Sequence, residues 1–175
     1  NVYVSDRVND RIQKFDSSGN FLLKWGSSGE GDGQFDGPFG VAVDSSGNVY
    51  VTGGQNSRIQ KFDSSGNFLL KWGSNGSGDG QFNSPHGIEV DSSGNVYVVD
   101  LLSNRVQKFD SSGNFLLKWG SLGSGNGQFF SPYGAAVDGS GNVYVTEKTN
   151  HRIQKFDSSG NFLLKWGSNG IGDGE

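Results

Sequence analysis

Short runs of alternating hydrophobic and polar residues fill the chain, and the same order of runs returns every 47 residues. In the second copy the runs are Asn48–Thr52, Arg58–Phe62, Phe68–Trp72 and Gly87–Asp91, which are rich in β-branched and aromatic residues. That composition and the two-residue alternation favour β-strands. No run has the length or the 3.6-residue period of a helix. Each copy therefore predicts four short strands.

Two kinds of connection join these strands. The segments Asp63-Ser-Ser-Gly-Asn67 and Asp91-Ser-Ser-Gly94 have the composition of tight turns, in which Asp caps the backbone and Gly takes the left-handed conformation. The other two connections are a glycine-rich linker that begins at Gly73 and a variable loop of about six residues. We name the strands of a repeat a, b, c and d, which in the third copy are the ranges Gly87–Asp91, Asn95–Val99, Arg105–Phe109 and Phe115–Trp119.

The repeats cover residues 1–47, 48–94, 95–141 and 142–175, and the fourth is shorter than the others. Four short strands in a period of this size indicate one blade of a β-propeller, an all-β fold of four-stranded antiparallel sheets. The first repeat starts at strand b, so we expect the first blade to lack its inner strand. The sequence contains no Met. We therefore expect residues 1–175 to be one propeller region that belongs to a longer chain or to a blade-sharing homo-oligomer.

Within this pattern the segment 85–100, Pro-His-Gly-Ile-Glu-Val-Asp-Ser-Ser-Gly-Asn-Val-Tyr-Val-Val-Asp, followed by Asn104-Arg105-Val-Gln-Lys-Phe-Asp, resembles the NHL repeat. The Gly-Asp-Gly-Gln-Phe linker is also typical of that family. The resemblance implies a propeller, usually with six blades. The family's Asp-x-x-Asn-x-Arg segment is only partly present, because the acid is Asp6 and Asp100 in two copies but Gly53 and Glu147 in the others. Its Asn is replaced by Ser103 in the third copy, whereas its Arg is present in all four.

Sequence differences among the repeats are confined to the b–c loops and the d–a linkers, while the a–b and c–d turns are almost invariant. In an antiparallel blade the b–c and d–a connections share one end, so the variable residues should gather on one face of the disc. A scaffold with one variable face is typical of a binding surface, although drift in loops is the simpler alternative. The candidate ligand-binding residues at these positions are Asp6, Arg7, Phe39, Gln55, His86, Glu89, Leu101, Leu102, Tyr133, Glu147 and Lys148.

Charge argues against a nucleic-acid partner. The variable segments carry only two cations, Arg7 and Lys148. They carry eleven acids: Asp6, Asp10, Glu30, Asp32, Asp36, Asp79, Glu89, Asp100, Glu147, Asp173 and Glu175. A phosphate backbone needs a cationic surface. Some NHL propellers bind RNA, but this face would repel it unless the repeated arginines dominate.

Residues for catalysis or metal binding are few. The chain has no Cys and only two His, His86 and His151. A His-based metal site needs several converging ligands, so we expect neither a metal nor another cofactor. Glu89 is the one acid in a strand a and is read first as a structural residue. The Gly-Asp-Gly linkers lack the ligand spacing of a calcium loop.

The leading hypothesis is a non-catalytic scaffold that binds a protein, a small molecule or a glycan on the variable face. One alternative is a structural protein that forms rings or filaments through an open blade edge. A metal-dependent propeller lyase or hydrolase is the weakest alternative. No apolar run reaches the length of a membrane span, so we expect a soluble protein. No localisation signal is evident, and an extracellular location is compatible.

Overall fold

The structure is a computed structural model that describes residues 1–174. Its strands form one three-stranded and three four-stranded antiparallel sheets, in chain order. The first sheet contains β1 (Val2–Asp6), β2 (Arg11–Phe15) and β3 (Phe21–Trp25), and the second β4 (Pro38–Val43), β5 (Val49–Gly53), β6 (Arg58–Phe62) and β7 (Phe68–Trp72). The third contains β8 (Pro85–Val90), β9 (Val96–Asp100), β10 (Arg105–Phe109) and β11 (Phe115–Trp119), and the fourth β12 (Pro132–Val137), β13 (Val143–Glu147), β14 (Arg152–Phe156) and β15 (Phe162–Trp166).

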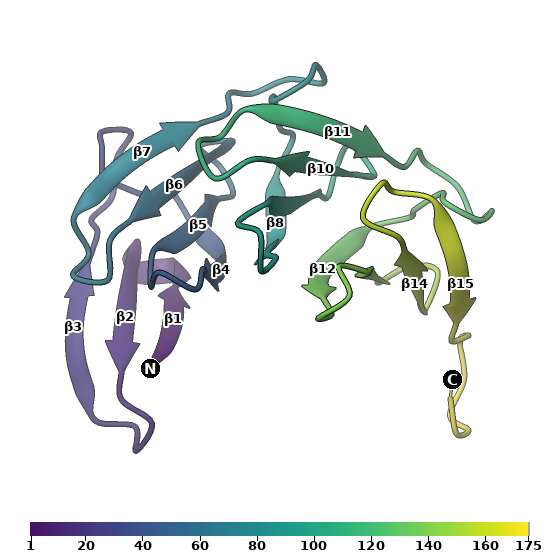
Figure 1. Ribbon diagram of the computed structural model, residues 1–175, viewed down its shortest axis with the longest axis horizontal. Coiled ribbons are helices and arrows are strands. Elements are labelled where there is room, and N and C mark those ends of the chain that lie inside the picture. Colours follow the sequence, from purple (N-terminus) through teal and green to yellow (C-terminus); the bar gives the residue numbers. More distant parts are fainter. Residues whose placement is uncertain (175) are drawn as a thin grey trace.

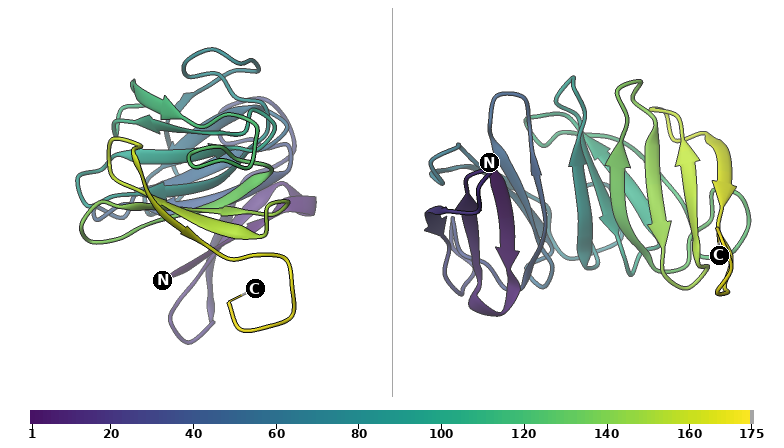
Figure 2. Two further views of the ribbon diagram at one scale, coloured as in Figure 1. Left: turned by 90° about the vertical axis from the view of Figure 1, so that its right-hand side faces the viewer. Right: turned by 90° about the horizontal axis from the view of Figure 1, so that it is seen from below.

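The four sheets stand side by side along an open arc (Figure 1). The inner strands β4, β8 and β12 lie on its concave side, the outer strands β3, β7, β11 and β15 lie on its convex side, and the two ends are separated by a gap. Views from the side show the sheets following one another as adjacent blades (Figure 2). The all-β propeller architecture is confirmed, and the first blade lacks its inner strand as predicted.

The strand bounds agree with the pattern in strands c and d, strand b lies one residue later than predicted (β9, Val96–Asp100), and strand a differs more. The c and d strands of the third blade have the predicted limits, but β8 begins at Pro85 rather than Gly87. Pro85 pairs with Asp100 before a bulge, and Ile88 then pairs with Val98, so the strand gains two residues at its start. A second difference is a turn of 3₁₀-helix, η1 (Arg7–Asn9), in the first b–c loop.

The Asp-Ser-Ser-Gly turns form as predicted. One carboxylate oxygen of Asp63 accepts the amides of Ser65 and Asn67 at 2.8 and 2.9 Å, and the other accepts the Asn67 side-chain amide at 2.8 Å. Gly66 has φ of 82°, which a residue with a side chain rarely adopts. The turn therefore satisfies its own backbone and closes the hairpin without help from the core.

The hydrophobic core lies between blades. The Trp72 ring of β7 packs on Phe109 of the next blade at 5.8 Å between centroids, and Trp25 and Trp119 repeat this contact with Phe62 and Phe156. The central strands β5 and β9 are buried at every position because neighbouring blades cover both of their faces. Each fully buried aromatic or aliphatic side chain stabilises the fold by roughly 1.5–3 kcal/mol.

The two ends of the blades carry different connections. The b–c loop packs against the d–a linker, since the amides of Leu101 and Leu102 donate to the carbonyls of Ser84 and Asn83. The structure therefore places the variable connections together on one face, which we call the variable face.

Candidate functional site

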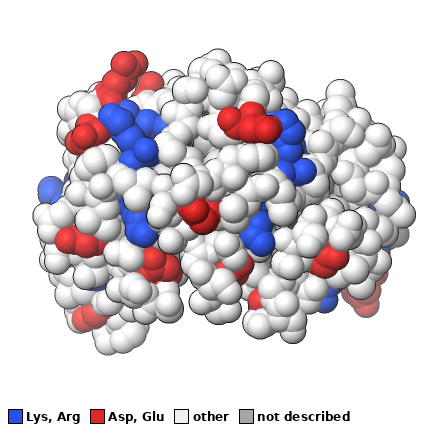
Figure 3. Space-filling model, turned by 45° about the horizontal axis from the view of Figure 1, so that its top comes forward, with Lys and Arg blue, Asp and Glu red and all other residues white. Residues whose placement is uncertain are grey.

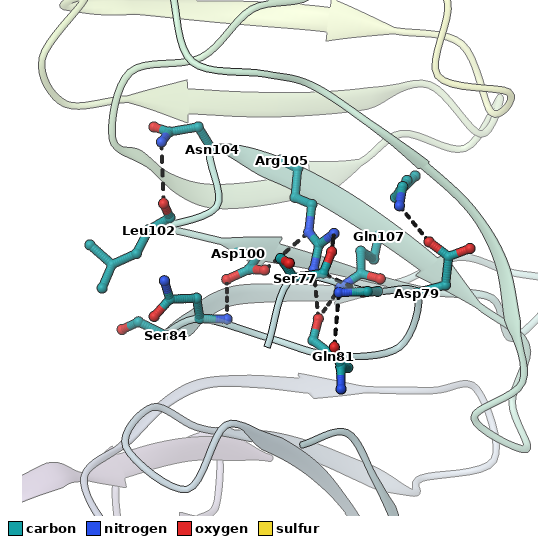
Figure 4. A network of polar contacts seen from close by, with 12 residues as sticks. Ser77, Asp79, Gln81, Ser84, Asp100, Leu102, Asn104, Arg105 and Gln107 are labelled. Carbon is teal, nitrogen blue, oxygen red and sulfur yellow. Dashed lines mark hydrogen bonds and ion pairs between the residues drawn. The ribbon is translucent and has the colours of Figure 1, made fainter. Parts of the chain in front are cut away.

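Arg58, Arg105 and Arg152 each join their own blade to the linker that precedes it. In the third blade the hairpin register sets Arg105 opposite Asp100, and its Nε donates to the Asp100 carboxylate at 3.1 Å. The remaining guanidinium nitrogens donate to the carbonyls of Ser77, Gly78 and Gln81 at 2.6–3.1 Å (Figure 4). This network fixes the path of the linker across the blade.

The same network explains two of the predicted site residues. Asp6 accepts from Arg11 Nε at 2.8 Å, and the buried carboxylate of Glu147 accepts from Arg152 Nε at 2.6 Å. Both acids are therefore engaged inside the scaffold, and we leave them out of the candidate ligand site. The five-residue spacing between acid and Arg in the sequence carries this signal, because it places the two side chains opposite each other across a b–c hairpin.

A row of aromatic rings lies at the inner end of the variable face. Phe39, His86 and Tyr133 occupy the second position of β4, β8 and β12. The ring centroids of Phe39 and His86 are 3.8 Å apart, and those of His86 and Tyr133 are 5.1 Å apart. His86 is only 6% exposed, whereas Tyr133 is 47% exposed and forms the open end of the row. The structure thus brings together three residues that the sequence placed at equivalent positions.

Glycines allow the three inner strands to approach so closely. A Cβ atom on Gly40 would lie 2.4 Å from the His86 carbonyl oxygen, and one on Gly87 would lie 2.7 Å from that of Tyr133. Thr52 in β5 links its blade to β8, because its hydroxyl donates to the His86 carbonyl at 2.8 Å. The rings and these glycines line a shallow, mainly apolar cavity of about 300 Å³.

The His86 ring is held in its neutral form. Its Nδ1 lies 3.1 Å from the Ser84 carbonyl oxygen, to which a protonated Nδ1 can donate. Burial lowers the pKa of His86, because a charged ring loses hydration there. Near neutral pH the row therefore presents an uncharged stack.

A cation from another blade completes the row. The Arg7 guanidinium lies 4.3 Å from the Phe39 ring centroid, on η1 of the first blade. Such a cation–π contact stabilises the pair by about 0.5–1 kcal/mol at an exposed site. Sequence reasoning named both residues but did not pair them, because their contact depends on how two blades meet.

These blades match a known family. The model of the NHL repeat matches residues 35–62, 82–109 and 131–156. The three matched repeats are NHL repeats. A search of curated proteins found no match.

Solved structures share the fold of these NHL repeats at low sequence identity. Virginiamycin B lyase from Staphylococcus aureus aligns with a TM-score of 0.71 and 15% identity over 97% of this chain and 52% of its own length. A streptogramin B lyase aligns with a TM-score of 0.69 and 17% identity over 95% of this chain and 51% of its own length. Kuenenia stuttgartiensis hydrazine synthase aligns with a TM-score of 0.69 and 12% identity over 93% of this chain and 44% of its own length. The chain spans about half the length of these proteins, and the likeness shows the fold alone.

Two further grooves recur on the variable face of the NHL blades. One, of about 540 Å³, is lined by Gln55, Arg58 and Trp72, and the other, of about 580 Å³, by Leu102, Arg105 and Trp119. Gln55 therefore borders the first groove and the exposed Leu102 the second. The Arg and Trp that line both grooves are the same in every repeat, whereas the residues from the variable loop differ between the two grooves.

The remaining predicted residues make contacts other than ring contacts with the aromatic row. The side chain of Glu89 in β8 accepts the backbone amide of Val90 at 3.0 Å. The amide of Lys148 donates to the Ser131 carbonyl at 3.0 Å, and that of Leu101 to Ser84 at 3.1 Å. Their contacts hold the b–c loops and strand a in place.

Ion pairs offset much of the acidity predicted for the variable segments. Asp100 and Glu147 are bonded to the repeated arginines, and Asp32 and Asp79 to Lys71 and Lys118. On the face in Figure 3, basic side chains lie beside acidic ones in small groups, and neither sign covers a continuous area. With Asp6, five of the eleven acids named in the sequence are thus local partners of scaffold cations.

Among residues 1–174, no three His, Cys, Asp or Glu side chains lie together as a metal site would require. No helix of the described chain is long and apolar enough to cross a membrane.

Proposed function

We propose that this NHL-repeat chain is a non-catalytic binding scaffold whose ligand occupies the aromatic row at the inner end of the variable face. The proposal rests on one observation. Three residues that differ in type among the repeats, Phe39, His86 and Tyr133, lie in a continuous row, and the b, c and d strands and the tight turns of the blades are nearly identical. A scaffold that keeps its frame and varies one contiguous surface has the organisation of a binding module.

The geometry favours a ligand with a flat apolar part, such as an aromatic ring or the apolar face of a sugar. Tyr133 contacts the His86 ring at a tilt of 58° and is half exposed, so a ligand ring can pack on its exposed side. Glycine backbones form the other walls, which leaves room for a planar group. Arg7 at the far end of the row adds a positive charge that favours an anionic substituent.

We assign no catalysis to this site because general acid–base or nucleophilic chemistry needs a base within reach of a reacting group. His86, the one imidazole in the row, is buried and lies against a backbone carbonyl. A role as a lyase, suggested by two of the structural neighbours, would come from the shared fold only.

Ligand-observed NMR with a panel of small aromatic carboxylates and methyl glycosides tests the proposal. We expect saturation transfer from the wild-type chain and its loss in Tyr133→Ala. Tyr144→Phe is the matched control, because Tyr144 belongs to β13 and packs on Trp166 rather than on the row. Equal signals from wild type and Tyr133→Ala, or loss in the control alone, would refute the site.

Assembly is a second candidate, favoured by the outer faces of the first and fourth blades. Trp166 is 42% exposed, although its equivalents Trp25, Trp72 and Trp119 each pack on the next blade. On the first blade a Cβ at Gly19 would meet nothing within 4 Å, whereas one at Gly66 would touch Trp25. In their b, c and d strands these two faces carry the same residues as the internal blade contacts, so a second copy could join them head to tail.

Sedimentation velocity over a wide range of protein concentration tests assembly. We expect association that weakens in Trp166→Ser but not in Leu163→Ser. Leu163 is a suitable control because its equivalents Leu22, Leu69 and Leu116 are exposed to the same degree in every blade. A monomer at all concentrations would exclude this second candidate without affecting the aromatic row.

A further inference from the structure

The second blade keeps the donors of the arginine network but lacks its acid. In the fourth blade the Glu147 carboxylate accepts four hydrogen bonds, from Arg152 Nε, Gln154 Nε2, Asn150 Nδ2 and the Phe130 amide, at 2.6–2.9 Å. The second blade has the same four donors, namely Arg58, Gln60, Asn56 and the amide of Asp36. Where the acid should stand, it has Gly53.

The consequence is visible at Arg58. Its terminal nitrogens donate to the carbonyls of Glu30, Gly31 and Gln34, as in the other blades. Its Nε is buried without an acceptor, the one such arginine atom among residues 1–174. The residue is only 8% exposed, and Glu30 and Asp32 act on it through space without forming an ion pair. An unpartnered buried donor on a charged group is costly.

Space for an acceptor follows from the missing side chain. A Cβ on Gly53 would meet its nearest atoms, the Arg58 carbonyl oxygen and Asn56 Cβ, at 3.5 Å, which is ordinary contact. The backbone around it is held as in the other blades, because the amides of Gly54 and Gln55 donate to Gly37 and Asp36 just as those of Leu101 and Leu102 donate to Ser84 and Asn83. The position therefore has room for a side-chain Cβ and a backbone held as at Asp100.

We propose that the second blade binds the carboxylate group of a small ligand at Gly53, where it takes the place of the acid side chain of the sibling blades. Arg58 Nε, Gln60 Nε2 and the Asp36 amide are its donors, and Asn56 closes the site in the manner of Asn150. Entry takes an opening of the 53–56 segment, whose two adjacent glycines permit such movement. The site uses none of the residues of the aromatic row but lies next to it, since a Cβ on Gly54 would lie 2.7 Å from the Phe39 ring.

Thermal unfolding in sodium formate, compared with sodium chloride at equal ionic strength, tests this site. We expect the wild-type midpoint to rise with the logarithm of formate concentration once binding saturates. In Gly53→Asp the tethered carboxylate occupies the site, so the formate-specific rise should vanish. Asp100→Gly, which creates the same gap in the third blade, should be less stable than wild type and respond more strongly to formate.

A second measurement covers the case in which a variant does not fold. The ¹³C resonance of formate should broaden saturably in the presence of the wild-type chain. Excess acetate should reverse the broadening by competing for the site. Wild-type midpoints that are equal in formate and chloride, or broadening that acetate does not reverse, would overturn the proposal. If the wild-type chain binds the aromatic ligands but not formate, the carboxylate site is refuted and the proposed function stands.

Discussion

Restoring the missing acid by Gly53→Asp should stabilise the protein. Arg58 Nε is buried and has no acceptor, while the equivalent atoms of Arg105 and Arg152 each donate to a carboxylate. Gly53 lies in β5 without a positive φ, so a side chain there introduces no backbone strain. Asp100 in the third blade shows the conformation that the new residue would adopt.

The expected gain follows from three terms. A hydrogen bond to a charged group contributes about 1.5–3 kcal/mol, and relief of one unsatisfied donor is included in that figure. Replacing Gly reduces the entropy of the unfolded chain and adds about 0.4–1 kcal/mol. Burying the new carboxylate costs several kcal/mol before its attraction to Arg58 is counted, and these nearly cancel in a well-bonded pair. We expect a net gain of about 1–3 kcal/mol.

Urea and thermal denaturation measure this gain, at about 2–4 °C for each kcal/mol in a chain of this size. Asp100→Gly is the inverse control, since it removes the acceptor from Arg105 and should cost about 3–5 kcal/mol. If Gly53→Asp is neutral or destabilising while Asp100→Gly is strongly destabilising, Arg58 is already satisfied in solution. The argument for both the substitution and the carboxylate site would then fail.

Two further substitutions test the inner strands. Gly87→Ala should lower the free energy of unfolding in urea by about 1–3 kcal/mol, because its Cβ would lie 2.7 Å from the Tyr133 carbonyl oxygen. The control Gly139→Ser, whose side chain enters open space, should change that free energy by less than about 0.5 kcal/mol. Similar costs for the two variants would contradict the close approach of the strands. Burial lowers the pKa of His86, so the unfolded chain binds its proton more readily and stability should fall as pH drops below about 6.5. His86→Tyr should remove the part of the stability loss between pH 7.5 and pH 5 that comes from His86, whereas the control His151→Asn should not. An unchanged loss of stability in His86→Tyr would contradict a buried neutral ring.

The order of strands and their faces could be predicted because every repeat contains its own tight-turn sequences. The turn at Asp63 is stabilised by hydrogen bonds within five residues, so local sequence is enough to place it. The start of β8 could not be placed, since Pro85 joins the strand by pairing with Asp100 on a neighbouring strand across a bulge. That pairing depends on register rather than on composition.

The candidate site could be predicted in position but not in chemistry. Phe39, His86 and Tyr133 were recognisable because they vary at one place in an otherwise constant repeat. The contact of Arg7 with Phe39 joins two blades and depends on their relative placement. Asp6 and Glu147 also vary among the repeats, yet their partners lie across the hairpin, so variation alone did not separate scaffold from surface.

The packing of each Trp on the Phe of the following blade has a consequence for how the molecule unfolds. Because a blade touches only its neighbours, the free energy is approximately a sum of blade terms and junction terms, as in a one-dimensional lattice. The second and third blades each have two junctions, whereas the first and fourth have one. Amide hydrogens of β5 and β9 should therefore exchange last, and melting should progress from both ends of the arc toward its middle.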